Sequence, residues 1–209
     1  MDIDIIALYA LAVVGPIMVF LTHYVVKGRT RDMTRLWFIT FFSYMIYYWL
    51  AKSYNFYSDP RDIVYSFALL WPIAAILAFW LAERLTTKGT MVPFFKWMVY
   101  FIVAVAFSFI LDGAAGIFHW YTYNTENFMA NSSFVNPIGG LVMPALMPFL
   151  MGILMMGVFF LVFTVHKQIR MRRIDETSAT LLLAGLSVVM GGALWVAADL
   201  ILGFIKSMM

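Results

Sequence analysis

The sequence predicts an all-α, polytopic integral membrane protein with six transmembrane helices, and three observations support that fold class. Of the 209 residues, 64% are hydrophobic and only 12% are charged, whereas soluble domains average about half apolar and about a quarter charged. The mean hydropathy is +0.88. Six separate segments hold the roughly 20 mostly apolar residues that a membrane-crossing helix needs. We therefore expect a single transmembrane helical domain, residues 1–209, as a multi-pass protein of the cell membrane.

The first three segments differ in length and composition. Residues 5–26 form a long apolar run that ends in a basic tripeptide. Residues 36–51 are short and rich in tyrosine and tryptophan. Residues 63–82 contain Pro72, and we expect a kink there because proline removes one backbone hydrogen bond.

The last three segments exceed the minimum length of a membrane span. They cover residues 95–120, 137–165 and 179–205. Their extra length predicts tilt, or helix that extends beyond the bilayer.

Small residues and prolines recur every four positions in the fifth segment. They are Gly140, Pro144, Pro148 and Gly152, close to one face of a helix. Because proline cannot donate a backbone hydrogen bond, the two prolines leave carbonyl groups free near the outer membrane face. This face is therefore expected to lie against protein, either lining a cavity or packing closely on another helix.

Lysine and arginine are distributed unevenly between the connections. Eleven of the 14 basic residues belong to the first, third and fifth connections and their flanks, namely Lys27, Arg29, Arg31, Arg35, Arg84, Lys88, Lys96, Lys167, Arg170, Arg172 and Arg173. Because basic loops stay in the cytoplasm, we expect these three connections inside and both termini outside. Basic loops beside a bilayer meet anionic lipid headgroups, so no nucleic-acid partner is expected.

The sequence contains no cysteine and three histidines. Disulfides, thiolate metal sites, iron–sulfur clusters and cysteine nucleophiles are therefore excluded. A metal site built on Asp112 and His119 is the natural alternative use of an intramembrane acid. Metal sites usually need three or more protein ligands, so we expect no metal and no cofactor.

Two acidic residues, Asp112 and Asp199, lie inside apolar segments, where an ionisable side chain is costly and is a functional candidate by default. With the orientation above, both fall in the outer half of the bilayer and could share a depth. A carboxyl group in a low-dielectric pocket favours its protonated form, which is suited to protonating an alkene, an epoxide or a ketal oxygen. The alternative interpretation is structural, since a buried aspartate can simply accept hydrogen bonds from a neighbouring helix.

Helical spacing gives each acid particular neighbours. If the fourth helix continues, one face carries an acid, a glycine gap, an imidazole and a phenol, at Asp112, Gly116, His119 and Tyr123. The sixth helix has a comparable face at Gly192, Trp195, Asp199 and Gly203. An imidazole near the interface is also common at headgroup level, so His119 has two interpretations.

Residues 111–148 contain an ordered set of such features. An acid on a membrane helix is followed by a small residue, a Tyr-x-Tyr pair, a Gly-Gly turn and two prolines, at Asp112, Gly116, Tyr121-Thr122-Tyr123, Gly139-Gly140, Pro144 and Pro148. This stretch resembles the core of the membrane carotenoid-biosynthesis hydratases and of the spirocyclase-like membrane proteins, with aspartate where glutamate is usual. The resemblance implies a polytopic enzyme that acts on an isoprenoid-like or polyketide-like lipid by acid catalysis.

The leading hypothesis is therefore a membrane enzyme that hydrates, cyclises or isomerises an apolar, isoprenoid-like lipid. Asp112 is expected to be the general acid, and Asp199 its partner or the stabiliser of the developing cation. Aromatic faces suit a carbocation, and we expect the substrate pocket to include His119, Trp120, Tyr121, Tyr123, Asn124, Trp195 and Pro144.

Two other functions are open from the sequence. Short loops and small-residue stripes also fit a non-catalytic subunit of a larger membrane complex, or a homo-oligomer. Six helices are likewise a plausible size for a small-solute-binding transporter component, which would need an energy-supplying partner.

Overall fold

The computed structural model describes residues 10, 13, 17, 30–58, 68–86, 93–124 and 133–208. Its helices are α2 (Thr30–Ser53), α4 (Trp71–Thr86), α5 (Pro93–Ile117), α6 (Met147–Arg170) and α7 (Glu176–Met208). Its short strands are β1 (Tyr57–Ser58), β2 (Thr122–Tyr123), β3 (Ser133–Val135) and β4 (Val142–Pro144). The predicted first segment, 5–26, lies outside the described residues except at three single positions.

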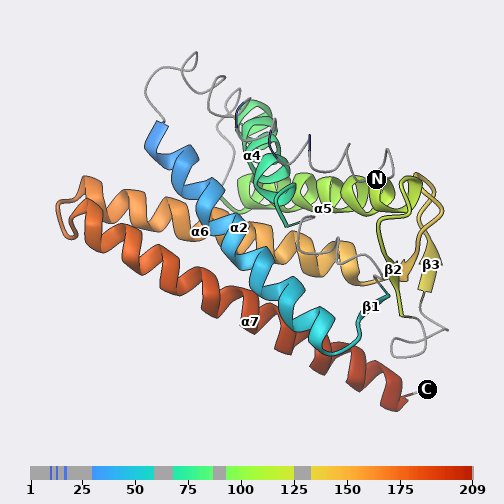
Figure 1. Cartoon of the computed structure of the whole chain (residues 1–209). Coiled ribbons are helices and arrows are strands. Elements are labelled where there is room, and N and C mark those ends of the chain that lie inside the picture. Colours follow the sequence, from blue (N-terminus) through green and yellow to red (C-terminus); the bar gives the residue numbers. More distant parts are fainter. Residues whose placement is uncertain are drawn as a thin grey trace.

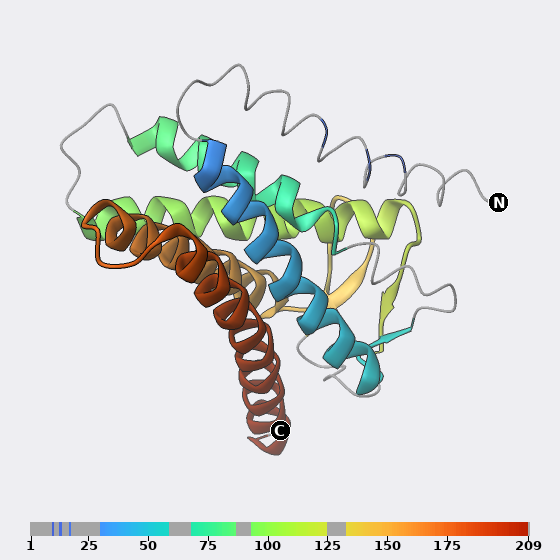
Figure 2. The same cartoon turned by 60° about the vertical axis from the view of Figure 1, so that its left-hand side comes forward.

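The helices pack as one bundle. Figure 1 shows α6 and α7 side by side and antiparallel, with α2 crossing them. Helix α2 is central, because it contacts α4, α6 and α7, whereas α5 packs mainly on α4 and α6. The strands gather at one end of the bundle, away from the turn between α6 and α7 (Figures 1 and 2).

Within the described ranges, three helices are long and apolar enough to cross a membrane, namely α5, α6 and residues Glu176–Ile201 of α7. These helices confirm the prediction of a helical protein with segments long and apolar enough to span a membrane. Helix α4 has only 16 residues, about 24 Å at 1.5 Å per residue. Helix α2 is longer, but its buried tyrosines, together with Thr40 and Ser43, reduce its hydropathy.

The helices expose apolar side chains outward as well as inward. Each described helix has large hydrophobic residues on its outer surface, among them Phe42, Trp80, Ile102, Phe160 and Val189. Soluble monomers rarely expose contiguous apolar patches of this extent. The outer surface of the bundle therefore suits lipid.

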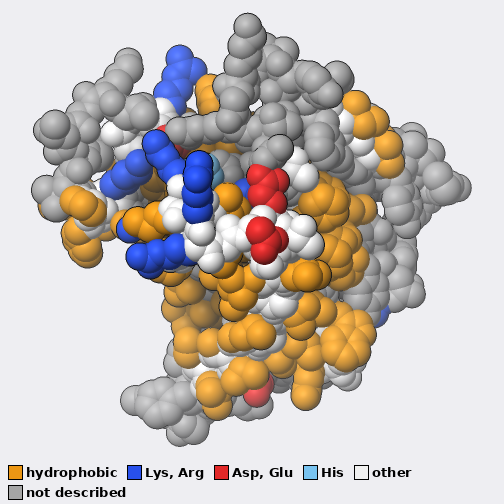
Figure 3. All heavy atoms as spheres, turned by 90° about the vertical axis from the view of Figure 1, so that its left-hand side faces the viewer, with side chains coloured by type: hydrophobic (Ala, Val, Ile, Leu, Met, Phe, Trp, Pro, Cys, Tyr) orange, Lys and Arg blue, Asp and Glu red, His pale blue; other side chains and the backbone are white. Residues whose placement is uncertain are grey.

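Basic side chains gather at the end of the bundle opposite the strands. Figure 3 faces that end and shows Lys and Arg side chains clustered above an apolar flank. The helix ends that meet there carry Arg35, Arg84, Lys96, Arg170 and Arg173. This distribution matches the expected division of the connections into a basic and a less basic side.

Three helices end in the same backbone motif. The second residue after α2, α5 and α6 has a positive φ, at Asn55 (54°), His119 (49°) and Arg172 (54°). The N–H of the next residue then bonds the carbonyl five positions earlier, as from Trp120 to Ala115 at 3.0 Å. This is the Schellman motif, in which the positive-φ residue is usually glycine. It reverses the chain at once.

The fourth segment does not remain helical to residue 120. Helix α5 ends at Ile117, and the Schellman turn at His119 leads into β2. The expected single helical face through Asp112, His119 and Tyr123 is therefore wrong. Only the first part of that pattern lies on the helix.

The fifth segment begins as a hairpin rather than as a helix. Strands β3 and β4 pair antiparallel, with Ser133 opposite Pro144, and α6 starts at Met147. Pro144 lies at a strand end and Pro148 in the first turn of α6, positions where a missing N–H is tolerated. The predicted four-residue stripe on one helix is wrong for this reason.

Candidate active site

Asp112 is the centre of the candidate site. It lies near the C-terminal end of α5, on the face that packs against the rest of the bundle. Its side chain is only 1% exposed. A carboxyl group buried this deeply needs hydrogen-bond partners.

Two tyrosines supply those partners. The Tyr121 hydroxyl donates to Asp112 Oδ1 at 2.6 Å, and the Tyr123 hydroxyl donates to the same oxygen at 3.3 Å. Both residues follow the Schellman turn at His119, which sends the chain back along the end of α5. Alternation along the extended segment then puts Tyr121 and Tyr123 on one face. The contact arises from the reversal of the chain and not from helical spacing.

Strand β1 adds a third tyrosine. It pairs antiparallel with β2, so that Tyr57 lies opposite Tyr123. The Tyr57 ring packs edge-on against Tyr121 at 4.9 Å between centroids. The hydroxyl groups of Tyr57 and Tyr47 lie 3.3 Å apart. The polar groups near Asp112 thus continue inward to α2.

The buried face of α2 was missing from the sequence-based site. Tyr44, Tyr47 and Tyr48 are fully buried. Trp71 stacks on Tyr44 at 4.0 Å and donates its indole N–H to the Tyr48 hydroxyl at 2.8 Å. The three tyrosines recur at positions i, i+3 and i+4, which is the signature of one helix face, and that signal could have found them.

The tyrosines beside Asp112 stay protonated. Burial first, and then the negative charge of Asp112 in its ionised form, raise the pKa of Tyr121 well above its ordinary value. The same two causes raise the pKa of Tyr123. Both phenols therefore act as hydrogen-bond donors to the carboxyl group.

The loop between β3 and β4 is pressed onto the end of α5. A Cβ added to Gly116 would lie 2.6 Å from the Gly139 carbonyl oxygen, and one added to Gly139 would lie 1.8 Å from that of Gly113. Asn136 fastens the loop, because its Nδ2 donates to the Phe109 carbonyl at 3.0 Å. The gap that the sequence places at Gly116 is thus filled by backbone.

The second oxygen of Asp112 has different surroundings. Asp112 Oδ2 is buried and has no hydrogen-bond partner among the described residues. Ser108 lies four positions earlier on the same face of α5, and its buried hydroxyl group is likewise without a partner in that part of the chain. A buried polar atom left in this way calls for an explanation.

A cavity of about 380 Å³ reaches the tyrosines from outside. Its walls come from the end of α5, from the segment that leads into β2, from β2 itself, and from the loop before β4 with the first residue of that strand. The lining residues are Gly116, His119, Tyr121, Thr122, Tyr123, Gly139, Gly140, Leu141 and Val142. Three of the predicted substrate-binding residues, His119, Tyr121 and Tyr123, therefore share one cavity.

The remaining predicted pocket residues are more scattered. Trp120 is buried and stacks on Phe118 at 4.9 Å. Asn124 extends the β1–β2 pairing through its backbone N–H. Pro144 is buried at the end of β4. Trp195 packs on Phe56 at 5.4 Å, in the aromatic layer beyond Tyr57.

Asp199 is not part of the site that the described residues form. It lies on α7 with an exposed side chain, and the described hydrogen bonds of Asp112 go to Tyr121 and Tyr123. Helix α7 packs mainly on α2 and α6, whereas α5 packs on α4 and α6. The expected pairing of the two acids therefore has no structural basis.

Among the described residues, no group of three or more His, Cys, Asp or Glu side chains is placed to hold a metal ion. Comparisons with protein-family models, with curated proteins and with solved structures find no significant match to this chain.

Proposed function

We propose that this protein is a membrane-embedded enzyme that hydrates, cyclises or isomerises an apolar, isoprenoid-like lipid by acid catalysis. One observation carries the proposal: the two oxygens of Asp112 have different surroundings. Oδ1 accepts hydrogen bonds from Tyr121 and Tyr123, whereas Oδ2 is buried without a partner among the described residues. A carboxyl group with one oxygen fixed by two donors and the other oxygen without a hydrogen-bond partner in the described chain is suited to proton transfer.

The proposed reaction begins with the proton on Asp112 Oδ2. Its transfer to an alkene carbon forms a C–H bond and leaves a cation on the neighbouring carbon. The carboxylate that results is stabilised by the phenol donors on Oδ1. In hydration, water adds to the cation and the added oxygen loses one proton. In cyclisation, a second alkene of the same substrate adds to the cation and the new cation loses a proton from a neighbouring carbon. In isomerisation, the first cation loses a proton from its other neighbouring carbon, and in all three cases this proton returns to Asp112. Each variant balances without an oxidant or a reductant.

Aromatic faces support the cationic step. The ring of Tyr121 lies 4.9 Å from that of Tyr57 and 5.8 Å from that of Tyr123, measured between centroids. The negative face of an aromatic ring attracts a cation. An apolar, aromatic surrounding also excludes bulk water, which would quench the cation before cyclisation.

The membrane arrangement completes the proposal. We place the basic end in the cytoplasm, as a multi-pass protein of the cell membrane with both termini outside. Asp112 then lies toward the outer side, because α5 begins at the basic end and Asp112 is near its other end. The resemblance of residues 111–148 to carotenoid-biosynthesis hydratases supports the same substrate class.

The test uses the purified protein in lipid nanodiscs. Long acyclic polyisoprenoid hydrocarbons are supplied in heavy water, and the products are analysed by mass spectrometry. We expect deuterium on carbon, with or without an added hydroxyl group. Asp112→Asn should lower turnover by about 100-fold or more and remain folded, since the amide oxygen still accepts from both tyrosines. Asp199→Asn is the matched control and should retain turnover.

Two results would contradict the proposal. Full turnover in Asp112→Asn would remove the acid from the mechanism. An absence of label, combined with stoichiometric co-purification of other polypeptides in mild detergent, would instead favour the non-catalytic subunit of a membrane complex.

A further inference from the structure

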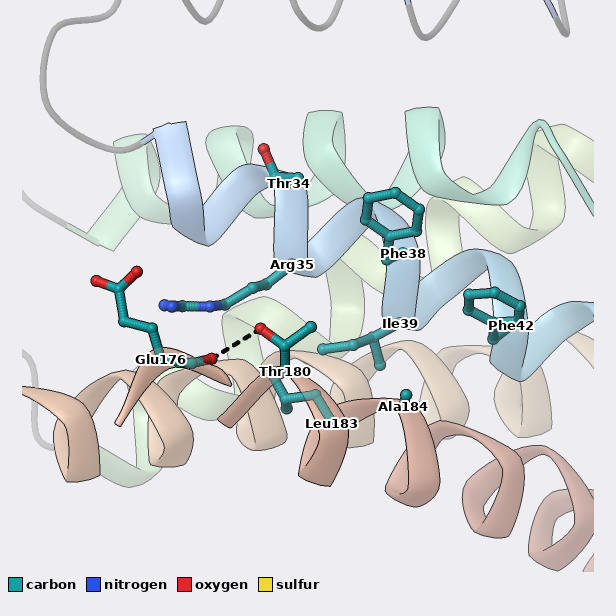
Figure 4. A pocket seen from close by; sticks show the side chains of 9 residues that line it. All are labelled: Thr34, Arg35, Phe38, Ile39, Phe42, Glu176, Thr180, Leu183 and Ala184. Atoms are coloured by element: carbon teal, nitrogen blue, oxygen red, sulfur yellow. Dashed lines mark hydrogen bonds between the residues drawn. The ribbon is translucent and has the colours of Figure 1, made fainter. Parts of the chain in front are cut away.

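A cleft of about 400 Å³ opens between α2 and α7 at the basic end of the bundle. It lies away from Asp112, near the first residues of both helices. Figure 4 shows the side chains that line it: Thr34, Arg35, Phe38, Ile39, Phe42, Glu176, Thr180, Leu183 and Ala184. Its size falls within the range of about 300–1,000 Å³ typical of ligand pockets.

The body of the cleft is apolar. Ile39 and Leu183 are each 2% exposed and form its floor. Phe38 and Phe42 recur at helical spacing along α2 and are 49% and 42% exposed. Figure 4 shows them following one another along α2, leading away from the charged mouth. A flexible hydrocarbon chain fits such a track.

The mouth of the cleft carries two opposite charges from two helices. Figure 4 shows the guanidinium group of Arg35, on α2, pointing toward the carboxylate of Glu176, at the start of α7. Thr34 and Thr180 also line the cleft. The backbone carbonyl of Glu176 already accepts from Thr180 at 2.9 Å.

We propose that this cleft binds one bilayer phospholipid whose zwitterionic headgroup carries a phosphate and a primary ammonium. A guanidinium group binds phosphate oxygens bidentately, which assigns the phosphate to Arg35. An ammonium group has three N–H donors, which assigns it to Glu176. An acyl chain lies along Phe38 and Phe42.

Charge complementarity selects this headgroup over the alternatives. A purely anionic headgroup leaves Glu176 beside negative charge. A choline headgroup carries a positive charge but no N–H donor for the carboxylate. The position supports a lipid rather than a soluble ligand, because the charged mouth lies at the basic helix ends and the apolar track on the outer surface of the bundle. This inference does not depend on the catalytic role of Asp112.

The experiment reconstitutes the full chain in nanodiscs of equimolar phosphatidylethanolamine, phosphatidylcholine and phosphatidylglycerol. Lipids retained on the protein after ejection from the disc are counted by native mass spectrometry. We expect phosphatidylethanolamine to be enriched about threefold or more over each competitor, the gain of roughly one partly screened charge contact. Glu176→Gln should abolish the preference for the ammonium headgroup.

A second variant tests the apolar track. Ala184 lines the cleft and is exposed, so Ala184→Phe fills the cleft without disturbing the core and should remove the retained lipid. Leu181→Phe adds bulk at a 70% exposed position of α7 outside the cleft and should leave retention unchanged. Arg84→Gln is the charge control, because it removes a positive charge at the same end of the bundle but outside the cleft, and it should also leave retention unchanged.

Three outcomes would overturn the proposal. Preferential retention of phosphatidylglycerol would make the site one for anionic lipid. Equal retention of phosphatidylcholine would remove the role of Glu176. Retention that survives Ala184→Phe would place the lipid elsewhere on the protein.

Discussion

Helices α5 and α7 invite comparison, because both are apolar enough to span a membrane and each carries one acid near its C-terminal end. Asp112 of α5 is buried, with two tyrosine donors. Asp199 of α7 is exposed and follows the α7 start by about 34 Å at 1.5 Å per residue, more than the roughly 30 Å of the hydrocarbon core. Asp112 is therefore enclosed by the protein, whereas the position of Asp199 suits the membrane–water interface.

This difference shows that the location of an acidic residue within an apolar run of the sequence does not by itself identify a functional acid. Both aspartates interrupt apolar runs in the same way. What separates them is the chain reversal after α5, which returns Tyr121 and Tyr123 to Asp112. The described part of α7 continues as helix past Asp199 and returns no partner to it.

The largest effect should come from replacing the two acids by leucine. Asp112→Leu leaves the Tyr121 and Tyr123 hydroxyl groups buried without their acceptor, so we expect the free energy of unfolding to fall by about 3 kcal/mol. Asp199→Leu should change it by less than about 0.5 kcal/mol. Unfolding by a denaturing detergent, followed by circular dichroism, measures both. Equal losses would contradict the comparison.

The next effect concerns close packing. Gly139→Ala places a methyl group against the Gly113 carbonyl oxygen, 1.8 Å from an ideal Cβ, and should destabilise the protein by about 2 kcal/mol. Gly185→Ala in α7 meets nothing within 4 Å and should stabilise the helix by about 0.5–1 kcal/mol. The same detergent titration distinguishes the signs. A neutral Gly139→Ala would mean that the loop is not pressed onto α5.

A smaller effect is expected at the end of α5. His119 has a φ of 49°, a conformation that costs a side-chain-bearing residue about 1–2 kcal/mol relative to glycine. His119→Gly should therefore stabilise the protein by about 1 kcal/mol, whereas His119→Ala should not. If His119 also contacts substrate, His119→Gly will raise KM while it raises stability. Thermal melts and kinetics together separate the two roles.

The smallest effect is expected at the start of α7. Asp175 Oδ1 accepts from the Ser178 N–H at 2.8 Å and Oδ2 from the Ser178 hydroxyl at 2.7 Å. These hydrogen bonds hold the pKa of Asp175 below its ordinary value of 3.8. Because the folded-state pKa is lowered, the stabilisation is complete above the ordinary pKa and is lost as the pH falls through the lowered one.

Asp175→Asn isolates this pH dependence. Asparagine is also a good N-cap, so the variant should retain most of the stability near neutral pH. Below about pH 4, where the Asp175 carboxylate of the parent protein becomes protonated, the Tm of the variant should fall less than that of the parent. Melts of both proteins across that range provide the measurement. Parallel curves would show that Asp175 does not contribute to acid sensitivity.

The helices were predictable where apolar runs are long. The runs at 95–120 and 179–205 correspond to α5 and α7, and Asp112 stands out as an acid within one of them. Hydropathy identifies such elements because helices satisfy their own backbone in lipid. The helix ends were less predictable, since glycine usually marks a Schellman turn and here the positive-φ residues are Asn55, His119 and Arg172.

The candidate site was predictable only in part. Asp112, Tyr121 and Tyr123 are close in sequence and were found together. The spacing of the α2 tyrosines identifies them only as one helix face. Neither they nor Tyr57 could be assigned to this site, because strand pairing and helix packing between distant segments bring them there. No local pattern encodes which helices are neighbours.

The order of Asp112, Tyr121 and Tyr123 along the chain affects how the protein inserts into the bilayer. When α5 inserts, Asp112 still lacks Tyr121 and Tyr123, which follow it in the chain. Even an aspartate at the centre of a helix opposes insertion by only about 3 kcal/mol, and one near the helix end, as Asp112 is, opposes it by less. Each Leu, Ile, Phe or Val favours insertion by about 0.3–0.6 kcal/mol. The many such residues of α5 outweigh one acid. The helix can therefore insert with Asp112 unpaired, and the acid is enclosed only when translation delivers its partners.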